Sequence, residues 1–222
     1  MIRLARPLIK VCGLTRPEDV QACLDLEVDL LGFVFNAASP RCVSPGLPAG
    51  IGDVAAFKVG VFTTQSVDEA LAILAEGRLD LAQLHGAQDE AFCEALGPER
   101  VIKVLWPESY ASEADFLADV ARFSGCCRFL LLDAGRSGGG HGRRMDPARF
   151  ARLPRGVEWF LAGGLSPANL AASLDACDPC GVDLNSGVES APGRKDADKI
   201  ARAVEIVRAR RLERDCSPLR RT

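Results

Sequence analysis

The sequence predicts a single α/β domain built as a closed (β/α)8 barrel, the TIM-barrel fold. Eight short apolar runs alternate with helical stretches, and the starts of these runs recur at a mean spacing of about 25 residues, enough for one strand, one helix and two loops. The runs contain few alternating polar positions, which is typical of parallel strands covered on both faces. An open doubly wound sheet is the competing fold, because it has the same alternation of strands and helices.

The predicted strands are β-branched or apolar runs of three to six residues. In a parallel barrel such strands point their carboxyl ends to one mouth, where functional residues gather. The strands are predicted at Leu8–Cys12, Leu30–Phe35, Phe57–Phe62, Asp80–Leu84, Val101–Leu105, Phe129–Asp133, Trp159–Ala162 and Val182–Leu184.

Helical periodicity follows most strands, and several of these segments begin with Asp, Ser or Pro, residues that cap or open helices. The segment Ser44–Ala56 should hold the second helix, but its prolines and glycines predict a short or irregular one. The other helices are predicted at Arg16–Leu26, Ser66–Glu76, Asp89–Leu96, Glu113–Phe123, Asp146–Leu153, Pro167–Leu174 and Asp196–Arg211.

The length of 222 residues fits one barrel, and the chain has no low-complexity segment or linker that would divide it. We therefore expect one catalytic domain over residues 1–211. The Arg-rich residues 212–222 are expected to form a frayed C-terminal tail.

Composition excludes several classes of partner. A net charge of −3 provides no basic field for nucleic acid. No segment approaches the roughly 18 uninterrupted apolar residues that a membrane helix needs. Because the N-terminus runs directly into a strand without an apolar signal region, we expect a cytoplasmic protein with no membrane partner.

The chain contains nine cysteines, an odd number scattered mostly through apolar segments. This distribution favours reduced, buried thiols over a disulfide framework. Cys177 and Cys180 form a CxxC pair, which we interpret as two small residues in a turn. With no second pair and two histidines in the chain, neither zinc nor another metal is expected.

Two strand ends carry candidate proton-transfer groups. The first strand ends in Cys12, directly before a glycine turn, and a thiol at a barrel mouth is a candidate reactive group. The sixth strand ends in Asp133, and the glycine-rich residues 134–145 that follow are typical of a mouth loop that acts as a lid. We interpret Asp133 as a candidate general acid or base.

Glycine turns follow the seventh and eighth strands. Gly163 and Gly164 end one strand, and Ser186 and Gly187 follow the next. Glycine allows backbone N–H groups to approach an anion closely, and these two loops are where phosphate sites form in this fold. We predict that the four residues bind a phosphate group.

Other polar residues come after the second and fourth strands. Arg41 could hold a second anion, such as a carboxylate, through its planar fork. Gln83 lies within the fourth strand, and His85 follows it at the same mouth. For His85, contact with a ligand and a structural hydrogen bond remain equal alternatives.

The order and spacing of these motifs resemble phosphoribosylanthranilate isomerase, the tryptophan-pathway (β/α)8 enzyme, over nearly the whole chain. The resemblance is more specific than any single motif. The matching pieces are Lys10-Val11-Cys12-Gly13-Leu14-Thr15, Gly32-Phe33-Val34-Phe35, Ser39-Pro40-Arg41, Val59-Gly60-Val61-Phe62, Gln83-Leu84-His85-Gly86, Leu132-Asp133, Leu161-Ala162-Gly163-Gly164-Leu165, Asp183, Ser186-Gly187-Val188-Glu189, Gly193-Arg194-Lys195-Asp196 and Lys199-Ile200.

This resemblance implies an Amadori rearrangement of N-(5-phosphoribosyl)anthranilate, a small phosphorylated substrate, without a cofactor. By position, Cys12 resembles the family's general base and Asp133 its general acid, with Arg41 on the anthranilate carboxylate. Asp183, together with Gln83 and His85, is expected to contact substrate. Opening a ribosyl ring requires one acid and one base, which agrees with this pair of residue types.

The sequence departs from the family pattern in three places. The loop after the sixth strand has a longer lead-in, lacks the usual aromatic residue and reads Asp146-Pro147 instead of Asp-Trp. Asn185 replaces a common Ser, and prolines and glycines degrade the second helix. Two alternatives remain: another phosphosugar isomerase, such as the histidine-pathway enzyme with two carboxylates, and a catalytically inactive phosphate-binding barrel. Monomer and homodimer are both left open.

Overall fold

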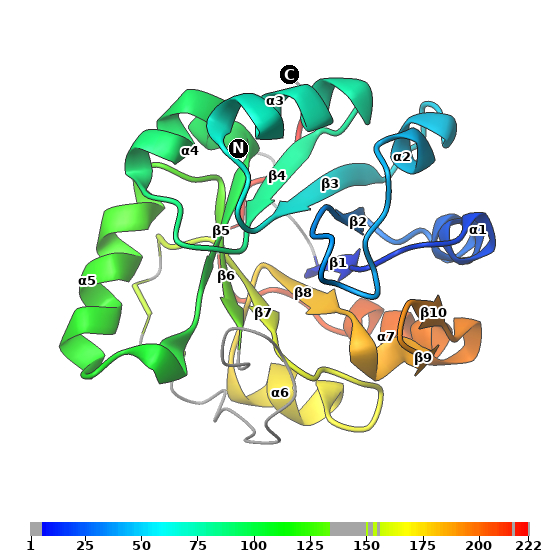
Figure 1. Cartoon of the computed structure of the whole chain (residues 1–222). Helices are drawn as coiled ribbons and strands as arrows, with labels where there is room; N and C mark the ends of the chain where they lie inside the picture. Colours follow the sequence, from blue (N-terminus) through cyan, green and yellow to red (C-terminus); the bar gives the residue numbers. More distant parts are fainter. Residues whose placement is uncertain (1–5, 134–149, 151–152, 155, 215, 222) are drawn as a thin grey trace.

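Eight parallel strands close into a barrel in the computed structural model, which describes residues 6–133, 150, 153–154, 156–214 and 216–221. Figure 1 shows the strands at the centre and the helices around them. The strands pair in chain order and β8 pairs with β1, which confirms the predicted (β/α)8 barrel. The strands are β1 Leu8–Val11, β2 Leu30–Val34, β3 Phe57–Phe62, β4 Leu81–Leu84, β5 Val101–Leu105, β6 Phe129–Asp133, β7 Trp159–Ala162 and β8 Gly181–Leu184.

Each strand begins and ends within one residue of its predicted bounds. The agreement has a physical cause: β2, β5 and β7 are buried at every position, because one face packs into the barrel and the other against helices. Strands in this setting are continuous apolar runs, which can be recognised without alternation.

The helices begin where the sequence carries capping signals. Ser66 and Glu69 form a capping box before α3, and the Asp196 carboxylate accepts the N–H of Lys199 at the start of α7. The helix predicted at Asp146–Leu153 lies mostly outside the described residues. The α-helices are α1 Pro17–Asp25, α2 Gly46–Gly50, α3 Val67–Glu76, α4 Glu90–Leu96, α5 Glu113–Ser124, α6 Leu170–Ala176 and α7 Ala197–Arg208.

The segment expected to be irregular contains only the five-residue helix α2, as predicted. Helix α6 begins later than predicted, because the turn before it is closed by the Asn169 side chain, whose Oδ1 accepts the Ser166 N–H at 2.8 Å. None of the helices in the described ranges combines the length and apolarity needed to cross a membrane.

The connection between β8 and α7 contains structure that was not predicted. A 3-10 turn at Ser186–Val188 leads into a small antiparallel hairpin, β9 (Glu189–Ala191) and β10 (Arg194–Lys195). These strands are too short and too polar to produce a recognisable pattern. The hairpin contributes two buried charged side chains, Glu189 and Lys195, next to the barrel mouth.

The barrel interior is a separate apolar cluster inside the larger core between strands and helices. Leu30, Val104 and Phe160 are fully buried within it. A third, smaller cluster of Cys12, Val34 and Val61 lies at the carboxyl ends of β1, β2 and β3. The interior is therefore packed with side chains below the mouth, as expected for this fold.

The C-terminal tail differs from the expectation that it would fray. Cys216 is 2% exposed and forms a disulfide with Cys180, at the amino end of β8. Leu212 and Leu219 pack against the barrel-interior cluster. In Figure 1 the red C-terminal trace passes behind the strands. The tail therefore covers the amino ends of the strands, which we call the barrel floor.

The disulfide also corrects the expectation of reduced cysteines throughout the chain. Cys180 pairs with a residue 36 positions away rather than with Cys177, its neighbour in the CxxC motif. The other seven cysteines are free, as expected. The floor thus combines one covalent cross-link with apolar packing.

Candidate active site

A buried ion pair lies inside the barrel directly below Cys12. Lys10 is fully buried, and its Nζ donates to Asp183 Oδ1 at 2.8 Å. The two residues are register partners on β1 and β8, so they occupy the same layer of the interior. Cys12 is two positions beyond Lys10 and therefore faces the same interior. The Cys12 thiol and the Lys10 ammonium both lie against Gly32 of β2.

Glycine at position 32 on β2 makes room for this pair. A Cβ there would lie 2.9 Å from Cys12 Sγ and 3.1 Å from Lys10 Nζ. Any larger residue would therefore displace the thiol or the ammonium from the layer. The absence of a side chain at Gly32 therefore allows the Cys12 thiol and the Lys10 ammonium to occupy this layer.

Burial raises the pKa of the Cys12 thiol, and the negative charge of Asp183 acts in the same direction. The Lys10 and Lys195 cations oppose this effect without reversing it. The thiol is therefore protonated near neutral pH in the ligand-free site. A role as base requires that substrate binding favour the thiolate, because the free site does not lower the pKa.

Asp133 at the end of β6 faces the same group of charges across the mouth. Burial is the largest cause of the raised pKa of Asp183, and the charge of Asp133 raises it further. Lys10 partly offsets both effects. Two carboxylates, one ammonium and one thiol thus share the upper interior of the barrel.

His85 and Gln83 lie together on the β4 side of the mouth. Gln83 Nε2 is 3.2 Å from His85 Nδ1, and the imidazole contacts Trp106 edge-on, with ring centroids 5.3 Å apart. Burial lowers the pKa of His85 to about 4, so the imidazole is neutral at physiological pH. Within the described part of the chain, the buried Gln83 Oε1 has no hydrogen-bond partner.

The two glycine turns predicted to bind phosphate lie against each other. Gly163 and Gly164 have positive φ angles of 100° and 64°, a backbone conformation that L side chains rarely adopt. A Cβ at Gly187 would lie 2.0 Å from the carbonyl oxygen of Leu165, so the loops after β7 and β8 are in direct contact. Ser186 opens the short 3-10 turn beside them.

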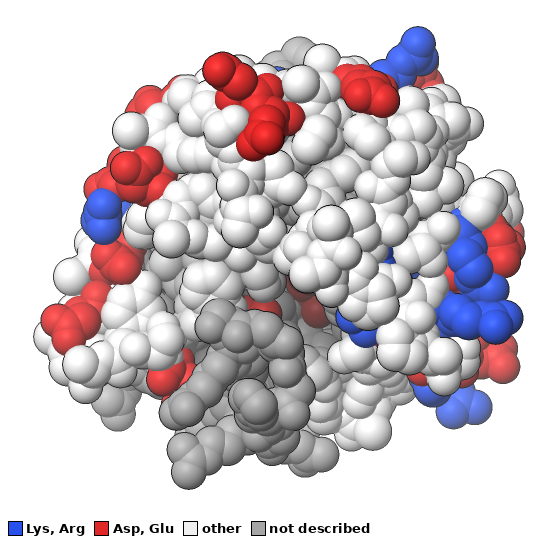
Figure 2. All heavy atoms as spheres, in the orientation of Figure 1, with Lys and Arg blue, Asp and Glu red and all other residues white. Residues whose placement is uncertain are grey.

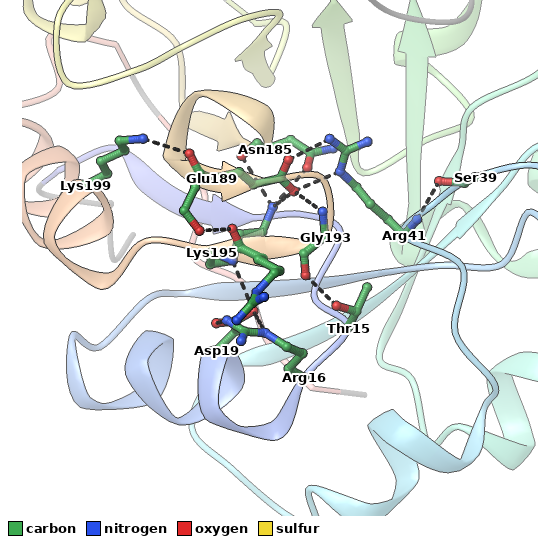
Figure 3. Close-up of polar contacts among 12 residues, drawn as sticks. Thr15, Arg16, Asp19, Ser39, Arg41, Asn185, Glu189, Gly193, Lys195 and Lys199 are labelled. Atoms are coloured by element: carbon green, nitrogen blue, oxygen red, sulfur yellow. Dashed lines mark hydrogen bonds and ion pairs between the residues drawn. The ribbon is translucent and has the colours of Figure 1, made fainter.

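Arg41 is held by a residue that the sequence analysis did not select. Its Nε donates to Glu189 Oε1 at 2.8 Å and its Nη2 to Oε2 at 2.6 Å. Glu189 also accepts from Lys195 Nζ at 2.8 Å, and Figure 3 shows it between the two cations. Arg41 and Glu189 are separated by 148 residues, so no local signal could have indicated the pair.

Arg41, which together with Glu189 and Lys195 forms a charged cluster, contacts the turn at Gly13 that follows Cys12. Gly13 has a φ of 73°, and a Cβ there would lie 2.5 Å from Arg41 Cδ and 2.9 Å from Asn185 Oδ1. The aliphatic part of Arg41 therefore packs against the turn that directly follows Cys12.

Basic side chains are visible on this side of the molecule around α1 and the hairpin, whereas acidic ones gather over α3, α4 and α5 (Figure 2).

No group of three or more His, Cys, Asp and Glu side chains within the described ranges is arranged to hold a metal ion. The predicted site residues with described positions, including both candidate proton-transfer groups, are distributed around one end of the barrel. The structure adds two features that the sequence analysis did not assign to the site. One is the ion pair between Arg41 and Glu189, and the other is the buried ion pair between Lys10 and Asp183.

Comparison with known proteins identifies the family. Residues 9–206 match the family model described as N-(5'phosphoribosyl)anthranilate (PRA) isomerase. The chain belongs to the phosphoribosylanthranilate isomerase family. The N-(5'-phosphoribosyl)anthranilate isomerase of Maridesulfovibrio salexigens is 53% identical over 200 residues, which cover 90% of this chain and 98% of the relative. That of Desulfovibrio desulfuricans is 47% identical over 199 residues, covering 90% and 94%.

Solved members of the phosphoribosylanthranilate isomerase family have the same fold. The Thermotoga maritima enzyme superposes with a TM-score of 0.81 at 29% identity, covering 91% of this chain and 99% of that one. A phosphoribosyl anthranilate isomerase in complex with reduced 1-(o-carboxyphenylamino)-1-deoxyribulose 5-phosphate superposes with a TM-score of 0.76 at 28% identity, covering 91% and 99%. Family membership confirms the resemblance and favours it over the histidine-pathway alternative.

Proposed function

We propose that this barrel converts N-(5'-phosphoribosyl)anthranilate into 1-(2-carboxyphenylamino)-1-deoxyribulose 5-phosphate, a step of tryptophan biosynthesis, without a cofactor. Family membership over 90% of the chain supports this reaction. The observation that carries it is the joint placement of Cys12 and Asp133 at the same end of the barrel, with the Lys10–Asp183 pair below.

The reaction is a pair of proton transfers on one substrate. Asp133 delivers a proton to the ribosyl ring oxygen as the bond between C1 and that oxygen breaks, which leaves a protonated imine between the nitrogen and C1. Cys12, as thiolate, then removes the proton from C2; the electron pair of that C–H bond forms the C1–C2 double bond of an enol, and the C1–N π electrons return to the nitrogen. Tautomerisation of the enol gives the ketone, so the reaction is an isomerisation with no net loss of atoms or electrons.

The anions of the substrate have separate binding positions in this proposal. Backbone N–H groups around Gly163, Gly164, Ser186 and Gly187 bind the phosphate, because glycine turns allow close approach of N–H groups to an anion. A crystal grown with phosphate or sulfate is expected to show the ion there. An anion bound at the mouth only by Arg143 and Arg144 would contradict this assignment.

Arg41 binds the anthranilate carboxylate at the other side of the mouth, and Gln83, His85 and Asp183 contact the sugar between the two anions. A neutral His85 suits this role, because it can donate one hydrogen bond and accept another.

The direct test of the activity is a turnover assay. Mixing the purified protein with N-(5'-phosphoribosyl)anthranilate is expected to cause a loss of the fluorescence of this anthranilate derivative. The Cys12→Ala variant is the matched control for contaminating activity. A folded protein that binds the substrate but leaves its fluorescence unchanged would instead support the catalytically inactive alternative.

Two further expectations remain proposals. The protein is expected to act in the cytoplasm, as a monomer or homodimer. Dimeric and monomeric forms are both named for the Thermotoga maritima relative. Sedimentation of the purified chain measures its oligomeric state directly.

A further inference from the structure

The residue that holds Arg41 is almost fully buried. The Glu189 side chain is 4% exposed, and both of its oxygens contact cations. Its Oε1 also accepts the backbone N–H of Gly193 at 3.2 Å, within the hairpin. Lys199 Nζ donates to the Glu189 carbonyl oxygen at 2.7 Å, which fixes the backbone as well (Figure 3). A carboxylate held by this many contacts has one orientation.

Glu189 uses only one edge of the Arg41 guanidinium. A guanidinium has two bidentate edges, one formed by Nε and Nη2 and the other by Nη1 and Nη2. The contacts with Glu189 involve Nε and Nη2. The Nη1 and Nη2 edge therefore keeps two parallel N–H donors for a second carboxylate, and the Arg41 side chain is 19% exposed.

The charges of the cluster favour an anion at that edge. Glu189 is shared by Arg41 and Lys195, so the three side chains together carry one excess positive charge. The nearby Asp19 does not cancel it, because its carboxylate is paired with Arg16 and also accepts the Lys195 backbone N–H. Lys195 is held further by Asn185 Oδ1 at 3.0 Å.

From these contacts we infer that Glu189 is a positioning residue for carboxylate recognition. It binds the Nε and Nη2 edge of Arg41 and leaves the Nη1 and Nη2 edge oriented toward the anthranilate carboxylate. The inference rests on the proposed function for the identity of the ligand. Holding the arginine in place before the ligand arrives reduces the side-chain entropy that binding must remove. The balance with Lys195 prevents Glu189 from cancelling the charge of Arg41.

The test compares two ligands on the Glu189→Gln variant. One is reduced 1-(2-carboxyphenylamino)-1-deoxyribulose 5-phosphate and the other is the same compound without its carboxylate. A glutamine amide carries no charge and has an NH2 donor in place of one acceptor oxygen, so it cannot accept both the Nε and the Nη2 hydrogen bond of Arg41. We expect the dissociation constant to rise about tenfold for the first ligand and to stay within about twofold for the second.

A matched control is Glu158→Gln, because Glu158 also pairs with an arginine, Arg128 at 2.5 Å, but at the barrel floor. This control is expected to bind both ligands like the wild type. A kinetic readout separates positioning from chemistry: KM should rise in Glu189→Gln while kcat changes by less than about threefold. In an Arg41→Ala background, Glu189→Gln should have no further effect on the first ligand.

An equal loss for both ligands, or a gain for the carboxylate ligand, would overturn the inference. The first result would indicate a purely structural role, and the second would indicate that Glu189 mainly neutralises Arg41. If Glu189→Gln does not fold, Lys195→Met provides the test, because it keeps the Arg41 contact and removes the excess charge. It should weaken the carboxylate ligand about threefold and leave the other unchanged; an equal effect on both overturns the inference.

These measurements remain informative if the reaction itself is absent. Ligand binding is measured without turnover, so a wild-type protein that binds both compounds but does not isomerise would contradict the proposed function alone. Selective loss of the carboxylate ligand in the variant would still support the role of Glu189.

Discussion

The two ends of the barrel are built from different interactions. At the mouth, buried charges such as Lys10, Asp183 and Glu189 are held by specific partners, and glycines with positive φ occur in the turns after β1 and β7. At the floor, the tail packs with apolar side chains and a disulfide between Cys180 and Cys216. The candidate site and the cross-linked floor therefore lie at opposite ends of the barrel, an arrangement typical of this fold.

The floor also uses arginines, but in another way. Arg221 donates to the carbonyl oxygens of Val54 and Ala56 at 2.6 and 2.7 Å, and Arg128 donates to that of Ser217 at 2.7 Å. These partly exposed contacts join the tail to the ends of loops, and the charges of Arg221 and Arg128 are compensated by ion pairs with Asp80 and Glu158. The comparison predicts that changes at the mouth affect turnover and that changes at the floor affect stability.

The largest expected effect concerns Cys12 and Asp133. Replacing either with Ala should lower kcat by about 10²–10⁴, the usual range for a positioned proton-transfer group, with little change in binding. The double variant should lose less than the product of the single losses. Cys12→Ser is the sharper probe, because a hydroxyl keeps the size but not the acidity of a thiol. Near wild-type turnover in Cys12→Ser would contradict the assignment as base.

At the floor, removal of the disulfide should lower stability without lowering activity. Replacing Cys216 by Ser is expected to reduce the free energy of unfolding by about 2–4 kcal/mol, the typical contribution of a disulfide. Urea unfolding with and without reductant measures it, and Cys42→Ser, at an exposed free cysteine, is the matched control. A loss of kcat equal to that of Cys12→Ala would show that the two ends are not separate.

Arg41→Ala sharpens the comparison within the mouth. A charge-assisted contact contributes roughly 1.5–3 kcal/mol, so affinity for substrate should fall about ten- to a hundredfold. An analogue without the carboxylate should bind the variant and the wild type equally. If both ligands lose the same affinity, Arg41 serves a purpose other than carboxylate binding.

The smallest expected effect is a pH dependence of stability that originates at the mouth. The folded pKa of His85 is lowered to about 4, below the unfolded value of 6.5. As the pH falls through this window, the unfolded chain binds the proton first, so stability decreases by roughly 1–3 kcal/mol. Urea unfolding at pH 7.5, 5.5 and 4 should show a smaller decrease for His85→Gln than for the wild type. Equal decreases would contradict the assignment to His85.

The fold could be predicted because the strands are short, largely apolar runs without regular alternation of polar residues. Phe57–Phe62 and Val101–Leu105 were predicted with the bounds that the structure has, since burial on both faces leaves a pattern in the sequence itself. Helix caps such as Ser66 are equally local signals. Features encoded within a few residues are those that the sequence analysis found.

The features that were missed depend on residues far apart in the chain. Cys180 pairs with Cys216 rather than with the nearer Cys177, and only the folded tail brings the two together. Candidate residues at strand ends could be selected because the fold fixes where strand ends lie. The partner of Arg41 could not, because Glu189 comes from a hairpin whose short polar strands have no characteristic pattern.

The ion pair between Lys10 and Asp183 joins the first strand to the last, across 173 residues. During synthesis the lysine emerges early, whereas the aspartate emerges only when most of the chain has been made. A nascent chain that lacks β8 therefore contains a lysine whose burial would have no compensating charge, and such burial is costly. Closing the seam of the barrel and completing the charged layer below the mouth therefore depend on the same ion pair.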